Sequence, residues 1–181
     1  MHRFKLFLSS LAIVAACAAG GSAAAATYNV TFAGGHATHL PWMKAIKEFY
    51  IPEVDKRLAG MGGQHKIVWN QAFGGTVAKV RGVLEAVQEG VTEMGMVYTI
   101  FEPAKLPLLA VTFMAPFGTD DVPLVSRILV EMNDEMEALR AEWGKHNQVF
   151  LGAVAADTDH IWTKFPVTSI ASLTRTKRGR A

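Results

Sequence analysis

Two histidines in the motif HATH, His36 and His39, are the first residues whose type and spacing could do chemistry. Imidazole nitrogens are common metal ligands, but a zinc site needs three or four ligands with supporting hydrogen-bond partners. No third ligand accompanies the pair at a recognisable spacing, so the sequence argues against a metal site. Two interpretations stay open: His36 makes a polar contact at the mouth of a strand, or the histidines lie in a loop or cap a helix.

A glycine pair followed by threonine, Gly74-Gly75-Thr76, is the second candidate. Placed before a helix, it could direct backbone N–H groups at an anion, helped by the positive end of the helix. The spacing matches neither the phosphate-binding loop GxxxxGK[ST] nor the dinucleotide motif GxGxxG, so no nucleotide cofactor is expected. An ordinary turn before a helix explains the same residues.

The third group consists of Asp157, Asp159 and His160 in ADTDHIWT. We interpret them as solvated residues of a loop at a strand end, with a ligand contact as the alternative. No G-x-S-x-G elbow is present, and Ser126 and Ser169 lack the surroundings of a nucleophile. The sequence therefore predicts no catalytic residues, no enzyme activity and no cofactor.

Strands that alternate with helices must position these residues. Runs of apolar, β-branched and aromatic residues predict the strands, and apolar residues at helical spacing predict the helices. This order implies parallel strands in an open, mostly parallel α/β sheet flanked by helices. The expected strands are 28–32, 66–70 and 94–97. One expected helix follows a cap at Thr38 and kinks or restarts at Pro52, and the other runs from a cap at Thr76 to Gly90.

The strand at 94–97 is expected at the centre of the sheet, with Tyr98 at its carboxyl end. Ligands of open α/β sheets bind outside the carboxyl ends of the strands, so this end is the expected site. The next passage contains Pro103, Pro107 and Pro116. It is expected to be an ordered crossover and not a helix, because proline lacks a backbone donor and favours extended geometry in the residue before it.

The second half of the chain is expected to hold the longest helix. Asp120 or Asp121 is its expected cap, and its buried stripe runs to Trp143. The apolar run 148–155 predicts another strand, and 161–163 could form one more. The acids of the helix are expected on a solvated face, with no catalytic role: Asp134, Glu135, Glu137 and Glu142.

Residues 1–26 have the features of a secretory signal peptide: a basic start, an apolar stretch from Leu6 to Ala19, and a small-residue site that predicts cleavage after Ala26. A membrane anchor is the weaker alternative, because the apolar stretch falls short of the ~20 residues that a span needs. Lipoprotein processing at Cys17, the single cysteine, is also less favoured. The signal peptide predicts export of the protein, and a chain cleaved after Ala26 would contain no thiol.

The chain of 181 residues suggests a single domain with a substantial core, because half of its residues are hydrophobic. Between the signal peptide and the basic tail at 174–181 there are 12 basic and 16 acidic side chains, a net charge of −4. No basic patch with interleaved aromatic residues is apparent there, so nucleic acid is not an expected partner. The tail has no apolar period and is expected to be disordered.

Four segments of the chain resemble the solute-binding subunit of tripartite ATP-independent periplasmic (TRAP) transporters, of the C4-dicarboxylate-binding type. The segments are YNVTFAGGHATH, FYIPEVDKRLA, the run from VLEAVQEG to LLAVTFMAPF, and KFPVTSIASL. The resemblance covers about residues 27–173 and rests on the order and spacing of the segments. It implies a periplasmic-binding-protein-like α/β lobe that helps to enclose a carboxylated small molecule for delivery to the membrane permease subunits.

The C-terminal end of the chain departs from the family pattern. The family continues from this region into a second lobe, whose first strand carries an arginine that pairs with the solute carboxylate. Here the chain continues as TRTKRGRA, and none of its arginines is in that context. We therefore expect a truncated form that retains the first lobe, 27–173, and could self-associate through the exposed half-interface. A non-binding secreted lobe, either a gene remnant or an interaction module, is the alternative.

The resemblance implies ligand contacts in the turns that follow the three strands. Tyr98 would stack on the solute or donate a hydrogen bond to it, or would pack in the core instead. The implied ligand-binding residues are His36, Ala37, Thr38, Phe73, Gly74, Gly75, Tyr98, Thr99 and Trp162.

Overall fold

The computed structural model describes residues 25–114, 118–156 and 162–174. The group Asp157, Asp159 and His160, the residues of the tail from 175 onward and nearly all of the expected signal peptide lie outside these ranges. None of the helices in the described ranges is long and apolar enough to cross a membrane.

The strands are β1 (Ala26–Gly34), β2 (His65–Ala72) and β3 (Met94–Met96). The α-helices are α1 (Pro41–Ala45), α2 (Ile51–Gly60), α3 (Val83–Gln88), α4 (Val111–Met114), α5 (Val122–Glu135), α6 (Glu137–Gly144) and α7 (Ile170–Thr174), with a π-helical turn at Ile46–Tyr50 and 3-10 turns at Val80–Gly82, Thr99–Phe101 and Leu108–Ala110.

The three strands form a parallel sheet in the order β2-β1-β3, which confirms the α/β class. β1 pairs with β2 from Ala26, opposite His65, to Ala33, opposite Ala72. β3 is short and pairs only with the last residues of β1, from Phe32 to Gly34. The expectation that strand 94–97 is central is therefore wrong. β1 is the central strand, and β3 lies at an edge of the sheet.

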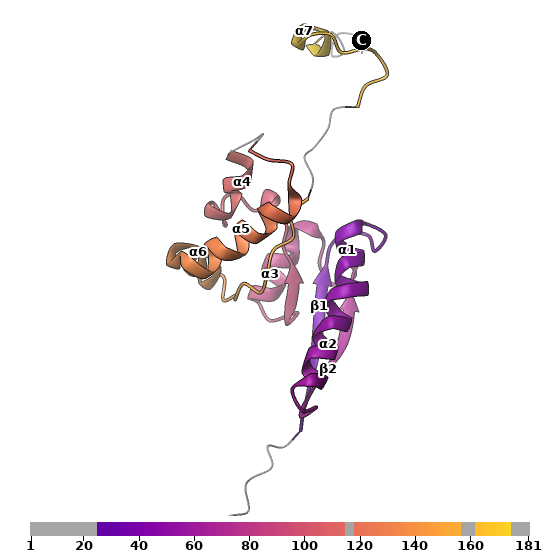
Figure 1. The fold of residues 1–181 in the computed structure, drawn as a ribbon, viewed down its shortest axis with the longest axis vertical. Coiled ribbons are helices and arrows are strands. Elements are labelled where there is room, and N and C mark those ends of the chain that lie inside the picture. The colour runs from indigo at the N-terminus through magenta and orange to yellow at the C-terminus, as the bar shows by residue number, and fades with distance from the viewer. Residues whose placement is uncertain (1–24, 115–117, 157–161, 175–181) are drawn as a thin grey trace, which may run out of the picture.

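Helices cover both faces of the sheet near the carboxyl end of β1 (Figure 1). Successive residues of a strand point to opposite faces. Phe32 packs into one core cluster with Met43 and Ile46 of the first helical segment, whereas Ala33 packs into another with Val83 of α3. The last part of β1 is therefore buried on both sides.

The first helical segment follows the predicted pattern, with two differences. The residue before α1 is Leu40, and no side chain caps the helix, so the predicted Thr38 cap is wrong. The predicted kink at Pro52 takes the form of the π-helical turn Ile46–Tyr50, directly before α2. A proline ring clashes with the carbonyl four residues earlier, and the widened turn contains that residue, Glu48.

The helix predicted from Thr76 to Gly90 is much shorter than expected. Residues 76–79 are not helical, and α3 begins at Val83 after a 3-10 turn. Gly82 precedes α3 without a side-chain cap, so the predicted Thr76 cap is also wrong. The backbone of Val80 approaches Gly35 so closely that a Cβ atom on Gly35 would lie 2.3 Å from the Val80 nitrogen. This contact between distant segments holds the start of the expected helix in a loop.

The longest helix begins as predicted, because the Asp121 carboxylate accepts a hydrogen bond from the Leu124 N–H at 2.9 Å. It does not run to Trp143. The chain is extended at Met136, and α6 then begins at Glu137. The Arg140 guanidinium donates hydrogen bonds to the carbonyl oxygens of Asn133 and Asp134, which satisfies groups left without helical partners by the break.

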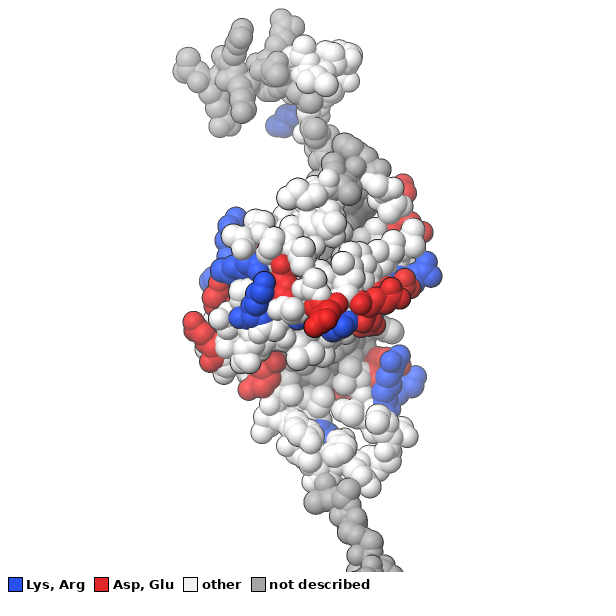
Figure 2. All heavy atoms as spheres, turned by 90° about the vertical axis from the view of Figure 1, so that its left-hand side faces the viewer, with Lys and Arg blue, Asp and Glu red and all other residues white. Residues whose placement is uncertain are grey.

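The expected solvated face is correct for three of the four acids. Asp134, Glu135 and Glu137 are exposed, and charged side chains gather in a band across the face shown in Figure 2. Glu142 differs, because only 2% of its surface is exposed. Its carboxylate accepts hydrogen bonds from the N–H groups of Leu108 and Leu109, at 3.1 and 3.3 Å. Glu142 therefore caps the 3-10 turn of the crossover and ties it to α6. The expectation that the crossover contains no helix is wrong, because this turn follows Pro107 and leads into α4.

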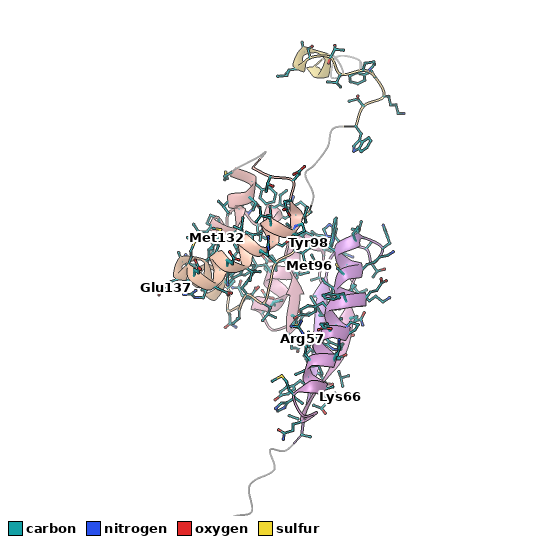
Figure 3. The ribbon with its side chains drawn as sticks, in the orientation of Figure 1. Arg57, Lys66, Met96, Tyr98, Met132 and Glu137 are labelled. Carbon is teal, nitrogen blue, oxygen red and sulfur yellow. The ribbon has the colours of Figure 1, made fainter. Side chains whose placement is uncertain are left out.

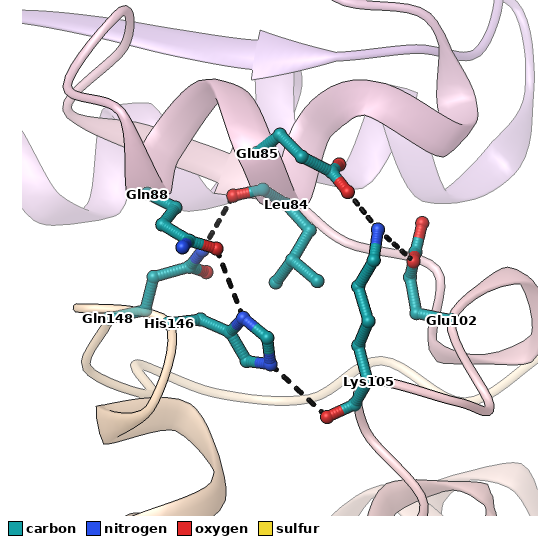
Figure 4. A network of polar contacts seen from close by, with 7 residues as sticks. All are labelled: Leu84, Glu85, Gln88, Glu102, Lys105, His146 and Gln148. Atoms are coloured by element: carbon teal, nitrogen blue, oxygen red, sulfur yellow. Dashed lines mark hydrogen bonds and ion pairs between the residues drawn. The ribbon is translucent and has the colours of Figure 1, made fainter.

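The strand predicted at 148–155 is wrong, because this segment has no strand pairing. Side-chain hydrogen bonds hold its beginning against other elements (Figure 4). The Gln148 amide donates to the carbonyl of Leu84 at 2.7 Å, and His146 lies between Gln88 and the carbonyl of Lys105. Apolar composition alone predicts a strand here, but pairing requires a neighbouring strand in register.

Glu93 extends the contact between β1 and β3 by one residue. Its carboxylate accepts a hydrogen bond from the Thr31 N–H at 2.7 Å, directly before β3 begins. This bond, followed by one from its own backbone N–H, lowers the pKa of Glu93 below its ordinary value of 4.5. A carboxyl group with a lowered pKa in the folded state contributes stability above its unfolded pKa, and the contribution is lost as the pH falls through the folded pKa.

We therefore expect acid to destabilise the protein less when Glu93 is replaced by glutamine. The amide oxygen of Glu93→Gln can still accept from Thr31, but it has no charge to lose. Urea unfolding at pH 7 and near pH 3 measures the difference for each variant. The neighbouring exposed Glu89, changed to glutamine, serves as the control. An equal acid sensitivity in wild type and Glu93→Gln would contradict this role.

Candidate ligand-binding site

The turns that follow the strands meet at the carboxyl edge of the sheet. The Gly74 N–H donates to the carbonyl of His36 at 3.0 Å, and the Gly75 N–H donates to the carbonyl of Gly34 at 3.1 Å. Both glycines have positive φ, 72° and 73°, a conformation that favours glycine. The glycine pair therefore forms a turn that is fastened to the end of β1, and its two N–H groups bond to the protein backbone and not to a free anion.

Four aromatic side chains gather at this edge and are called the aromatic cluster: His36, Trp42, Tyr98 and Phe101. The His36 and Tyr98 rings meet edge to face, with 4.1 Å between their centroids and an angle of 76°. The centroid of the Trp42 ring lies 5.7 Å from that of His36 and 6.2 Å from that of Tyr98. The centroids of the Phe101 and Tyr98 rings are 6.5 Å apart. The cluster joins the turn after β1, the start of α1 and the segment after β3.

Tyr98 lies at the centre of the cluster and at the end of β3, as the sequence predicted (Figure 3). Its hydroxyl points at two sulfur atoms, at 3.5 Å from Met96 Sδ and 4.0 Å from Met43 Sδ. Burial raises the pKa of the Tyr98 hydroxyl above its ordinary value, so the group stays neutral and cannot act as a base near neutral pH. Thioether sulfur is a weak acceptor, so the ring is the main chemical feature that Tyr98 offers.

Two buried nitrogen atoms of the cluster have no hydrogen-bond partner among the described residues: His36 Nδ1 and Trp42 Nε1. A buried polar atom without a partner costs about 1–3 kcal/mol. Such atoms are uncommon in folded proteins and often mark functional sites. Both atoms belong to residues at the expected binding edge.

One cation lies on the aromatic cluster, and a second lies on the glycine turn that is bonded to the end of β1. Lys79 Nζ donates to the carbonyl of Gly75 at 2.9 Å, and the Arg81 guanidinium carbon lies 5.0 Å from the centre of the Phe101 ring. Within the described ranges, every ion pair involves Glu53 or Lys105, so neither cation is paired with a carboxylate there. The carboxyl edge of the sheet therefore combines aromatic surface with uncompensated positive charge.

The structure brings most of the expected ligand-binding residues to this edge, but not all of them. His36, Ala37 and Thr38 form the turn after β1, and Thr99 begins the 3-10 turn after Tyr98. Phe73 is in the adjoining turn, but its side chain is 6% exposed and packs against Phe32 in the core.

Trp162 is not part of the aromatic cluster. It is 90% exposed and makes no ring contact among the described residues. The segment that continues from it to α7 lies apart from the other elements in Figure 1. Nothing in the described ranges therefore places Trp162 with the other expected ligand-binding residues.

Sequence reasoning missed four residues of the site. Trp42 falls within the helix predicted after Thr38, and its place in the first turn of α1 brings it to the carboxyl edge. Lys79 and Arg81 were placed within a helix that does not form there. Phe101 was read as part of the crossover. The closeness of HATH and Trp42 along the chain was the signal that could have found the aromatic pair.

The arrangement offers groups that could bind a ligand. In the described ranges no group of three or more His, Cys, Asp or Glu side chains is placed to hold a metal ion. The aromatic rings offer planar apolar surface, and the cations offer charge for an anion. Comparisons of the chain with models of protein families, with curated proteins and with solved structures find no match.

Proposed function

We propose that the chain is the periplasmic solute-binding subunit of a TRAP-type transporter, and that residues 27–173 form its first lobe. It would act by binding and not by catalysis. Its ligand is a carboxylated small molecule, which it delivers to the membrane permease subunits. The proposal rests on the resemblance in segment order described above and on one structural observation. The turns after three parallel strands meet near an aromatic cluster and two cations, neither of which is paired with a carboxylate in the part of the chain that the structure describes.

The convergence supports a binding role on physical grounds. Open parallel sheets bind ligands beyond the carboxyl ends of their strands, where loops and helix starts meet. The residues at this edge come from turns that backbone hydrogen bonds and ring contacts hold together. Such fixed residues lose little conformational entropy when a ligand binds, which favours affinity.

Thermal denaturation of the purified protein with a panel of carboxylic acids tests the proposal. A ligand at 100 times its Kd stabilises the folded state by about 2.7 kcal/mol, which raises the Tm of a chain of this size by roughly 5–10 °C. Neutral amides of the same acids serve as controls, because they keep the shape and remove the charge. If no acid raised the Tm, the proposal would be wrong.

Tyr98 is the first residue to change in this experiment. Because its hydroxyl faces Met96 and Met43, we expect Tyr98→Phe to keep the ligand-induced rise in Tm. Tyr98→Ala removes the ring and should lose most of that rise. The Tm of each variant without ligand separates lost binding from lost stability. A Tyr98→Phe variant that no longer responds would mean that the hydroxyl itself contacts the solute.

A non-binding secreted lobe is the second candidate, and the exposed apolar side chains favour it. Val149 and Leu151 are 83% and 66% exposed, Trp162 is 90% exposed and Ile170 is 83% exposed. Exposed apolar side chains mark a protein interface where they form a contiguous patch, and Val149 and Leu151 are close along the chain. Light scattering with and without ligand separates the candidates. Association without any response to acids would favour the second candidate, and an acid-responsive monomer would favour the first.

A further inference from the structure

Lys79 and Arg81 are fixed at the carboxyl edge by the backbone between them. Val80 lies against Gly35, where a Cβ atom would be 2.3 Å from the Val80 nitrogen and 2.4 Å from its Cα. Lys79 is extended, and Arg81 lies in the 3-10 turn that follows. The segment that carries both cations is therefore seated directly on the turn after β1.

Lys79 and Arg81 each contact a neutral group, so these contacts do not neutralise the positive charge of either side chain. The Lys79 amine uses one hydrogen bond, to the carbonyl of Gly75 at 2.9 Å, and an ammonium group has three donors. Arg81 lies over the Phe101 ring at 5.0 Å, a contact that orients the guanidinium without neutralising it. The five N–H donors of arginine match a planar carboxylate.

No ion pair in the described ranges joins an acid to Lys79 or Arg81. Glu85 and Glu102, on α3 and at the start of the crossover, both pair with Lys105 (Figure 4). A bound anion could accept charge-assisted hydrogen bonds from the free donors of these side chains, Lys79 and Arg81.

The surface beside Arg81 is aromatic. Phe101 lies under the guanidinium, and the centre of its ring is 6.5 Å from the centre of the Tyr98 ring. Tyr98 in turn contacts His36 and Trp42. A molecule whose carboxylate met Arg81 and Lys79 would therefore place the rest of its body near these rings. Offset and edge-to-face ring contacts favour a flat, apolar body over a small hydrophilic one.

We propose that Lys79 and Arg81 form the carboxylate-binding pair of this site, and that its preferred ligands are aryl carboxylates. The inference rests on the proposed function and names the substrate class for the same site. Under this inference the aromatic cluster borders the ligand body, and the two cations fix its charged end. Small aliphatic dicarboxylates would share the charge interaction but not the ring contacts.

Calorimetric titration of the purified protein with benzoate, benzamide and succinate tests the inference. We expect benzoate to bind more tightly than succinate, and benzamide to bind more weakly than benzoate because it lacks the charge. Arg81→Gln and Lys79→Gln should each weaken benzoate binding by about tenfold or more, as expected for loss of a charged hydrogen bond. Arg57→Gln and Lys66→Gln are matched controls, because both residues lie away from Tyr98 and should leave benzoate binding unchanged (Figure 3).

The outcomes separate this inference from the proposed function. If benzoate bound equally well to wild type, Arg81→Gln and Lys79→Gln, the cation pair would be wrong, while the binding role would stand. Tighter binding of succinate than benzoate would overturn the aryl class and keep the transport proposal. Failure of every acid to bind would overturn both. Unchanged Tm values of the ligand-free variants would show that any lost affinity is not lost folding.

Discussion

Gly35→Ala is expected to destabilise the protein by about 3 kcal/mol or more, at the upper end of what overpacking costs. The added methyl group would lie 2.3 Å from the nitrogen and 2.4 Å from the Cα of Val80. Both are backbone atoms, so no side-chain rotation can relieve the clash. Either the turn after β1 or the loop that carries Lys79 and Arg81 must move.

Urea unfolding monitored by circular dichroism measures this effect. Gly60→Ala is the matched control, because Gly60 ends α2 and a Cβ atom there would meet nothing within 4 Å. Alanine in a helix is favoured over glycine by about 0.5–1 kcal/mol, so this control should be neutral or slightly stabilising. Equal stabilities of Gly35→Ala and wild type would show that the close approach of the two segments is not present in solution.

Leu106→Ala is expected to cost about 2–5 kcal/mol, the range for removing a fully buried leucine side chain. Leu106 is 0% exposed and packs with Leu84 of α3 and with Leu139 and Trp143 of α6. Its loss would leave a cavity where the crossover, α3 and α6 meet. The expected result is a cooperative loss of stability and not a local change in the crossover.

Leu108→Ala is the control for this experiment, because it makes the same chemical change two residues further along the crossover. Leu108 is 45% exposed, so its truncation should cost no more than about 1 kcal/mol. Chemical denaturation midpoints of the two variants give the comparison directly. Similar losses in both would contradict the assignment of Leu106 to the shared core.

The strands were the part of the fold that the sequence predicted best. The three strands predicted in the first half of the chain all form, because alternation and β-branched or aromatic composition indicate residues that pack against a sheet. The position of β3 was wrong, because a local pattern carries no information about which strand becomes central. The run at 148–155 failed for a related reason: composition favours extended structure, but pairing depends on a distant partner.

Helix ends were predicted less well, because contacts between distant segments decide them. The contact of Val80 with Gly35 keeps residues 76–79 out of the helix. No sequence pattern in either segment predicts this contact. The break at Met136 likewise interrupts a regular apolar stripe. Asp121 was predicted correctly, because a capping interaction lies within four residues of sequence.

The candidate site was located from the sequence, but its chemistry was not. The rule for strand ends led to His36 and Tyr98, which do lie in contact. Lys79 and Arg81 could not be found in this way, because their place depends on a helix that starts later than expected. The role of Glu142 as a cap for the crossover could not be read either, because its partners are more than thirty residues away.

The central position of β1 fixes an order of events during synthesis. β1 is the first strand of the chain, yet both of its pairing edges belong to later segments. Its ladder with β2 cannot form before residue 65 has been made, and its ladder with β3 cannot form before residue 94. The central strand of the sheet is therefore synthesised before either of its partners. Until β2 and β3 have been made, both edges of β1 are unpaired and open to association with other chains.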